Sequence, residues 1–145
     1  MKILSTAGLK ARVETRMPDW LATHAAGVAP LGILILKHGC DTYALARSKD
    51  DLRLLADALR ESLAVLRAVG RRIVPQSTRL FELLPRWVVM RMFRLVLSSR
   101  WGEIGAGWHC SQAPDEIAQL GRELKQLVEK SGQPAPALRQ ILAAV

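Results

Sequence analysis

Residues 25–36 constrain this chain more than any other feature, because they are apolar on nearly every side of the helix that they predict. Such a helix must be covered by other elements, so we expect it at the centre of the fold. Pro18 suits its first turn and Gly39 its end. Pro30 is expected to kink or divide it. The run has about a dozen residues, whereas a bilayer span needs roughly 20. We therefore expect a soluble, cytoplasmic protein with no membrane partner.

Helical periodicity continues through most of the remaining chain. Leucines recur at steps of three and four at positions 52, 55, 59, 63 and 66. Ser48 and Asp51 resemble a capping box that opens this helix, and Gly70 suits its end. Further helices are predicted at residues 41–47, 78–84, 86–98, 114–131 and 137–145. The expected fold class is all-α, a multi-helix bundle.

The first 16 residues follow a different pattern. Residues 2–9 resemble the end of a helix, and residues 10–15 alternate polar and apolar side chains as a half-buried strand does. A single strand has no ladder partner, and unpaired backbone groups are costly once buried. We therefore expect this helix-strand remnant to belong to a sheet that the chain does not contain, or to pair with a second copy.

Composition indicates a basic globular protein. The chain has 145 residues, and its 21 Lys and Arg against 13 Asp and Glu give a net charge of +8. This excess favours phosphates, acidic partners or anionic lipid. Cys40 and Cys110 cannot form a disulfide framework. Together with His38 and His109 they lack the spacing of a zinc site, so we expect no metal.

The sequence contains no nucleotide-binding fingerprint. Gly102, Gly105 and Gly107 do not spell GxGxxG, and they follow a predicted helix where a phosphate loop should follow a strand. The motif GxxxxGK[ST] is absent from the sequence. We therefore expect the chain to hold no nucleotide cofactor by itself, and the glycines to interrupt or loosen the helix around them.

The predicted helix at 86–98 is amphipathic. One face carries Trp87, Arg91, Arg94 and Ser98, and the opposite face carries Val88, Val89, Met92, Phe93 and Val96. The cationic face could contact phosphate or a membrane surface. It could also be a solvated face on which Arg91 stacks on Trp87. We favour the solvated interpretation.

Two further polar residues are candidates for chemistry. His24 lies on a largely apolar helix face, where a histidine is either a hydrogen-bonded core residue or a titratable group available to a ligand. Glu116 lies beside Asp115 in a first helical turn. Because Asp115 can complement the helix dipole alone, Glu116 is left free for a ligand.

Several segments together resemble a known family. They are Ala7-Gly8, the predicted strand at 10–15, residues 17–26, Ala29-Pro30-Leu31, Asp115-Glu116-Ile117, Leu120-Gly121, Gly132 and Pro136. These segments are similar to the linker, first helix and penultimate helix in the C-terminal domain of ketopantoate reductase-like proteins (2-dehydropantoate 2-reductases). The resemblance covers nearly the whole chain and implies the helical fold of the 6-phosphogluconate dehydrogenase C-terminal domain.

The resemblance also implies an oxidoreductase in which a Rossmann domain binds NADPH and a helical domain closes over a small 2-oxo acid. Residues 1–16 would be the last helix-strand unit of an absent Rossmann domain, and residues 17–145 the helical substrate-side domain. The Rossmann domain would be a missing or separate partner. We expect the chain alone to be inactive, to hold no NADP, to form a homodimer and to bind no nucleic acid.

Residue by residue, the resemblance carries over only in part. Glu116 matches the glutamate with which the family contacts its substrate. The family's lysine acid has no counterpart at residues 19–23, and the serine that precedes the glutamate has none at residues 104–106. His24 and His109 are the only replacements that we offer as catalytic candidates.

The alternative function is a non-enzymatic helical interaction module. It would bind an acidic partner, such as nucleic acid, anionic lipid or an acidic protein, through the arginine-rich surface. Binding of this kind would weaken steeply with added salt.

Overall fold

The computed structural model describes residues 6, 8 and 15–145. The predicted helix at 2–9 and strand at 10–15 lie largely outside the described residues, so the division of the chain at residue 16 stays a prediction. The elements are α2 (Met17–Lys37), α3 (Thr42–Arg47), α4 (Lys49–Ala68), the 3-10 helix η1 (Gln76–Arg79), α5 (Leu80–Leu83), α6 (Arg86–Leu97), α7 (Arg100–Gly102), the π-helix η2 (Glu103–Trp108), α8 (His109–Gln112), α9 (Pro114–Ser131) and α10 (Pro136–Leu142). The expected all-α class is confirmed for the described part of the chain.

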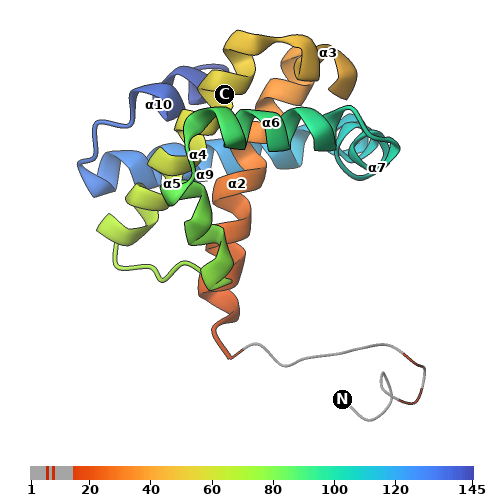
Figure 1. The fold of residues 1–145 in the computed structure, drawn as a ribbon. Helices are drawn as coiled ribbons and strands as arrows, with labels where there is room; N and C mark the ends of the chain where they lie inside the picture. The colour runs from red at the N-terminus through yellow and green to blue at the C-terminus, as the bar shows by residue number, and fades with distance from the viewer. Residues whose placement is uncertain (1–5, 7, 9–14) are drawn as a thin grey trace.

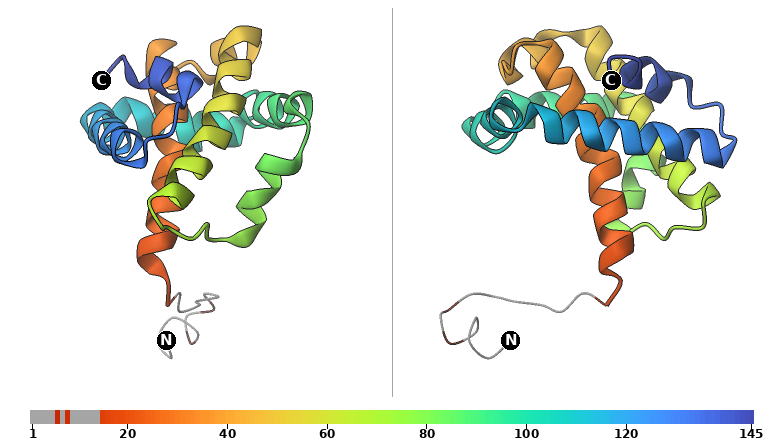
Figure 2. Two further views of the ribbon diagram at one scale, coloured as in Figure 1. Left: turned by 90° about the vertical axis from the view of Figure 1, so that its left-hand side faces the viewer. Right: turned by 180° about the vertical axis from the view of Figure 1, so that it is seen from behind.

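Helix α2 passes through the centre of the bundle, as its apolar run predicts (Figure 1). It contacts α4, α9 and α10, and most of its buried residues belong to its C-terminal half. Its N-terminal half extends beyond the crossing with α9 (Figure 2). The helix continues through Pro30, so the expected division does not occur. Pro30 is buried, and packing on α4 and α9 holds the helix together where the proline lacks an N–H group.

By length and composition alone, α2 could cross a membrane. The helix has 21 residues, longer than its apolar run, and 44% of its most apolar window is buried inside the protein. Buried core helices of soluble proteins meet the same criteria of length and hydropathy, and α2 packs on three neighbouring helices. The expectation of a soluble, cytoplasmic protein stays a prediction.

Helices α4, α9 and α10 complete the core around α2. The predicted leucine stripe of α4 is buried: Leu52, Leu55, Leu59, Leu63 and Leu66 are 0–6% exposed. The backbone N–H of Asp51 donates to Ser48 Oγ (3.3 Å), which confirms Ser48 as the cap. In α10, the backbone N–H of Leu138 donates to Glu61 Oε2 of α4 (2.7 Å). Local capping therefore sets where α4 begins, and a distant carboxylate anchors the first turn of α10.

Asp51 links the end of α2 to the start of α4. Lys37 Nζ donates to its Oδ1 (2.8 Å), while His38 Nε2 (2.8 Å) and Ser48 Oγ (2.9 Å) donate to its Oδ2. Burial raises the pKa of this carboxyl, but the three hydrogen bonds outweigh burial and hold the pKa below its ordinary value of 3.8. His38 thus has a structural partner.

Within the described residues, no three His, Cys, Asp or Glu side chains form a group that could hold a metal ion.

The buried face of α6 differs from the predicted one. Helix α6 packs on α3 and α4 through a stripe with a four-residue step. In this stripe Val89 and Leu97 are buried and Phe93 is partly buried. Met92 and Val96, assigned by the sequence to the apolar face, are 41% and 58% exposed. Val89 and Phe93 of the predicted face pack inward, but the hydrophobic pattern of the helix is broader than the surface that its neighbours cover, so the prediction is confirmed only in part.

Candidate functional site

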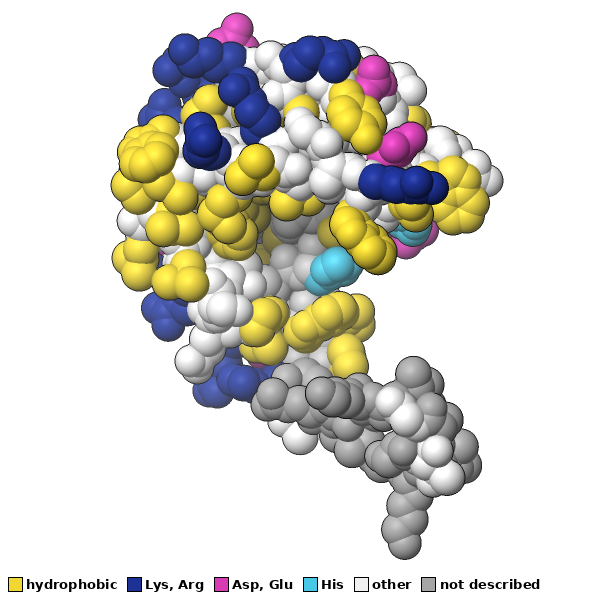
Figure 3. All heavy atoms as spheres, turned by 45° about the vertical axis from the view of Figure 1, so that its right-hand side comes forward, with side chains coloured by type: hydrophobic (Ala, Val, Ile, Leu, Met, Phe, Trp, Pro, Cys, Tyr) yellow, Lys and Arg dark blue, Asp and Glu magenta, His cyan; other side chains and the backbone are white. Residues whose placement is uncertain are grey.

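A hollow lies between α2 and the segment that runs from the end of α4 to α8 (Figure 3). It consists of two adjoining cavities of about 280 and about 260 Å³, which share His24, Val28 and Leu31. The first cavity continues to Gly105, Ala106, His109 and Cys110, and the second to Trp20, Pro75, Phe81 and Phe93. Figure 3 shows a histidine side chain on the wall of this hollow. A mainly apolar hollow with a few polar groups is the usual form of a small-molecule site.

His24 faces the hollow and is not a core residue. Its side chain is exposed, and its ring stacks on Trp20 with the centroids 5.1 Å apart and the planes 9° from parallel. In the described part of the chain, no hydrogen bond or ion pair engages its imidazole. The interpretation of His24 as a hydrogen-bonded core histidine is therefore wrong, because the N-terminal half of α2 extends past the helices that cover its other half.

His109 reaches the same hollow from the opposite wall. It is the first residue of α8 and follows the π-helix η2 directly, so of the two predicted effects of the glycines the helix is loosened into a wider turn and is not interrupted. A Cβ added at Gly107 would lie 3.0 Å from the carbonyl oxygen of Cys40. This close approach holds η2 against the turn after α2 and thereby positions His109. Single π-helical turns are frequent at functional sites.

Cys110 follows His109 in α8 and is a buried residue of the first cavity's lining. Burial raises the pKa of its thiol, and the neighbouring Cys40 raises it further. The thiol is therefore protonated at neutral pH, and the thiolate needed for nucleophilic chemistry is scarce. Cys110 serves this site as an apolar wall.

Glu116 lies away from the two histidines. Its side chain is exposed in the first turn of α9, and it lines neither cavity of the hollow. Its neighbour Ile117 is buried against Gly32, and Gly32 does line the hollow. The structure thus brings His24 and His109 together without Glu116, and a substrate contact by Glu116 stays a prediction.

Thr23 is a structural residue of the site that sequence analysis missed. Its Oγ1 donates to the carbonyl of Asp19 (2.9 Å) and accepts the backbone N–H of Val74 (3.1 Å). Both Thr23 and Val74 are buried. This bond holds the connector at Val74 and Pro75 against α2, where it forms part of the hollow. No local sequence signal predicts a contact between residues 51 positions apart.

We expect Thr23→Val to lower the free energy of unfolding by about 1–2 kcal/mol, because the N–H of Val74 would be buried without an acceptor. Thr23→Ser is the matched control, since it keeps the hydroxyl oxygen and should be clearly less destabilising. Denaturant unfolding of the three proteins measures both differences. Equal destabilisation in the two variants would show that the hydroxyl does not hold the connector.

The comparisons with known proteins leave the family of this chain open. No family model, no curated protein and no solved structure matches it. Its function is therefore argued from the hollow, its two histidines and the surfaces around them.

Proposed function

We propose that the helical part of this chain is the substrate-side domain of a reductase-like protein, which acts on a small 2-oxo acid together with a separate nucleotide-binding domain. The observation that carries the proposal is the shared hollow of His24 and His109, residues that are distant in the sequence. Both are exposed on its walls. The resemblance of residues 17–26 to the first helix of ketopantoate reductase-like C-terminal domains supports the same function.

The chemistry of the hollow suits a small oxo acid. An imidazole can donate a hydrogen bond to a carboxylate or to a keto oxygen, and in its protonated form it can pass a proton to that oxygen. Val28 and Leu31 line the same cavity as the two histidines and offer an apolar surface for a short alkyl chain. These residues can bind and orient such an acid, and one imidazole can act as the general acid.

The described residues contain no Rossmann-type site for the nicotinamide cofactor that a reductase requires. A dinucleotide pyrophosphate is held at a strand, a glycine-rich turn and a helix N-terminus. The described residues form helices and connectors without that unit. We therefore assign no step through the cofactor to this chain, and the hydride would come from the partner domain.

Exposed apolar side chains support the presence of such a partner. Within the described residues, the large exposed hydrophobic side chains belong to the start of α2 and to residues 80–108, two segments that also contribute other residues to the hollow. They are Met17, Leu21, Leu80, Leu83, Trp87, Met92, Leu95, Val96, Trp101, Ile104 and Trp108. Trp101 is 85% exposed. Apolar and aromatic clusters of this kind are typical of interfaces between proteins or domains. We propose the nucleotide-binding domain as the occupant, with a homodimer as the alternative.

The proposal is tested by observing the three histidines separately. The ring resonances of His24, His38 and His109 would be followed by NMR during titration with 2-oxoisovalerate, with 2-hydroxyisovalerate as the matched ligand without a keto group. We expect saturable shifts at His24 and His109, weaker for the hydroxy acid. His38 is the internal control, because it is bonded to Asp51. His24→Gln should abolish the response of His109.

Two results would contradict the proposal. The first is an absence of shifts at His24 and His109, or equal shifts at all three histidines, which would mean that the hollow does not select the acid. The second is micromolar binding of NADPH in the hollow by the chain alone, measured by the fluorescence of the cofactor and accompanied by shifts of the His24 and His109 resonances. Such binding would give the chain a nucleotide site of its own and remove the need for a separate domain.

A further inference from the structure

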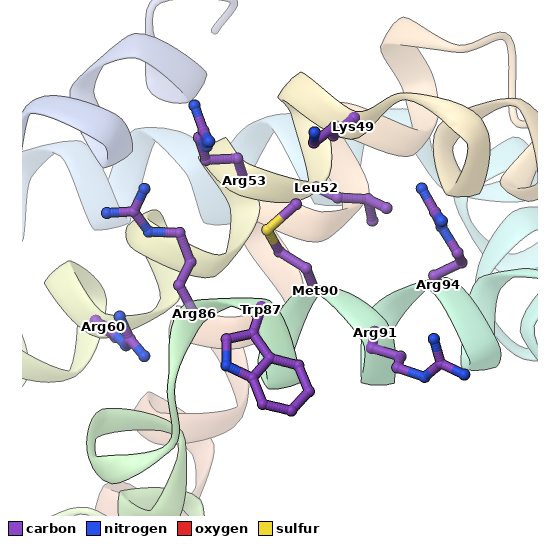
Figure 4. Close-up of a pocket in the computed structure, with 9 residues that line it drawn as sticks. All are labelled: Lys49, Leu52, Arg53, Arg60, Arg86, Trp87, Met90, Arg91 and Arg94. Carbon is purple, nitrogen blue, oxygen red and sulfur yellow. The ribbon is translucent and has the colours of Figure 1, made fainter.

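A second cavity lies apart from the hollow. It has a volume of about 710 Å³, lies between α4 and α6, and shares no lining residue with the two cavities at His24 (Figure 4). Its lining is Lys49, Leu52, Arg53, Arg60, Arg86, Trp87, Met90, Arg91 and Arg94. We call it the cationic groove. Its volume falls within the usual range for small-molecule sites, about 300–1,000 Å³.

Helical spacing brings the six cations of the groove together. On α4 they recur at 49, 53 and 60, and on α6 at 86, 91 and 94, so each set lies along one side of its helix. Figure 4 shows them around Leu52 and Met90, with Trp87 and Arg91 beside α6. The groove therefore has an apolar floor and a positively charged rim built from two helices. Trp87, Arg91 and Arg94, which the sequence assigns to a solvated face, are exposed and also line this cavity.

The charge of this rim is largely uncompensated. The lining includes no carboxylate. Of the six cations, Arg86 alone forms an ion pair in the described part of the chain, from its Nε to Asp57 Oδ1 (2.9 Å). Like charges that converge on one cavity repel each other, so the folded state would gain stability from a bound anion. The positive potential of a cavity with low-dielectric walls also concentrates anions there.

Two arginines are held in position before any ligand arrives. Arg60 donates from Nε to the carbonyl of Phe81 (3.1 Å) and also donates to the carbonyl of Leu84. Arg94 donates from Nε to the carbonyl of Ala46 (3.1 Å). Each keeps further N–H groups free, because a guanidinium has five. Such fixed guanidinium groups lose little conformational entropy when they bind phosphate in a bidentate manner.

We propose that the cationic groove binds a nucleoside polyphosphate, with its phosphates on Arg53, Arg91 and Arg94 and its base on Trp87. Several converging arginines match a multiply charged phosphate chain. The indole of Trp87 is 68% exposed at the rim and offers a flat face to a base. A small ligand fits better than a duplex or a bilayer, because these cations surround a cavity from two helices. The site is separate from the hollow, and the inference does not depend on the proposed reductase function.

Isothermal titration of the whole chain with ATP, tripolyphosphate and inorganic phosphate tests this site. We expect micromolar binding of ATP, somewhat weaker binding of tripolyphosphate and much weaker binding of phosphate. ATP should also raise the melting temperature. Arg53→Glu with Arg91→Glu should weaken ATP binding about 100-fold or more, because removing each charge-assisted hydrogen bond to phosphate weakens binding about tenfold. Within the described fold, the side chains of Arg53 and Arg91 form no hydrogen bond or ion pair. The variant should therefore keep the helical circular dichroism of the parent.

Two matched variants separate a site from general charge. Arg122→Glu with Lys130→Glu makes the same change in net charge on exposed positions of α9, outside the groove, and should leave most of the ATP affinity. Trp87→Ala should weaken ATP about tenfold and leave tripolyphosphate unchanged.

Several results would overturn the proposal. They are a dissociation constant for ATP above about 1 mM, equal weakening of ATP binding in the groove and α9 variants, and an equal effect of Trp87→Ala on ATP and tripolyphosphate. Binding of a single-stranded oligonucleotide more than tenfold tighter than ATP, abolished in the groove variant, would assign the groove to nucleic acid and would also refute the proposal.

Discussion

Replacing Gly102 by alanine is expected to destabilise the protein by about 3 kcal/mol, at the upper end for overpacking. A Cβ at this position would lie 2.2 Å from the carbonyl oxygen of Val96 and 3.1 Å from the Cα of Leu97. These are backbone atoms at the tight junction of α6 and α7, so no change of rotamer can relieve the contact. The same carbonyl accepts hydrogen bonds from the N–H (3.1 Å) and Oγ (2.6 Å) of Ser99, which holds it in place.

Gly105→Ala is the matched control for this prediction. Gly105 lies three residues further along the same helical segment, and a Cβ there would meet nothing within 4 Å. Because alanine favours helix over glycine by about 0.8–1 kcal/mol, this variant should be neutral or slightly stabilising. Denaturant unfolding of both variants measures the difference. A destabilisation at Gly105 as large as that at Gly102 would mean that helical geometry, and not the contact with Val96, governs the segment.

The expected displacement of η2 gives Gly102→Ala a second readout. The contact lies at the start of the segment that carries His109 to the hollow. If the backbone shifts to admit the new methyl group, the ring resonances of His109 should change more than those of His38, whose ring is held by Asp51. Unchanged His109 resonances would show that the backbone around residue 102 adjusts to the new methyl group without displacing η2.

Replacing Ile117 by alanine is expected to cost about 2–5 kcal/mol, the range for removing a buried isoleucine. Ile117 is 0% exposed and joins α9 to the centre of α2. It packs on Gly32, where an added Cβ would lie 2.8 Å from Ile117 Cδ1 and 2.9 Å from its Cγ2. The two helices approach this closely because one residue is glycine and the other fills the space that glycine leaves.

This arrangement predicts a compensating pair. Gly32→Ala alone should be destabilising, because its methyl group overlaps Ile117. In the Ile117→Ala background the same methyl group enters the cavity that the isoleucine vacates, so Gly32→Ala should there be neutral or stabilising. A double-mutant cycle measured by denaturant unfolding gives the coupling energy, expected at about 1–3 kcal/mol. Additive effects of the two substitutions would show that these residues do not share one space.

Helices and their ends were predictable because their causes are local. The period of Leu52 to Leu66, the Ser48 cap and the prolines at positions 18 and 114 act within one or two turns of chain. Within the described residues, the structure has a helix at each range where these local signals predict one. The continuity of α2 through Pro30 is the exception, because packing by neighbouring helices outweighs the local effect of the proline.

The sequence identified individual residues of the candidate site but not their arrangement in space. His24 and His109 are recognisable in the sequence as titratable groups, yet their meeting in one hollow follows from the crossing of α2 and the wide turn of η2. Glu116 shows the opposite outcome, since a residue prominent in the sequence lies outside the cavities. Thr23 was missed because its role depends on Val74, a residue of the distant connector.

For the described part of the chain, periodicity, caps and composition were enough to establish a helical fold with an excess of basic side chains. The tertiary arrangement alone decided which histidines share a hollow, which arginines of α4 and α6 converge on one cavity, and which apolar residues of α6 remain exposed. Helix formation depends on interactions within a few residues, whereas a site depends on which faces of distant helices pack together.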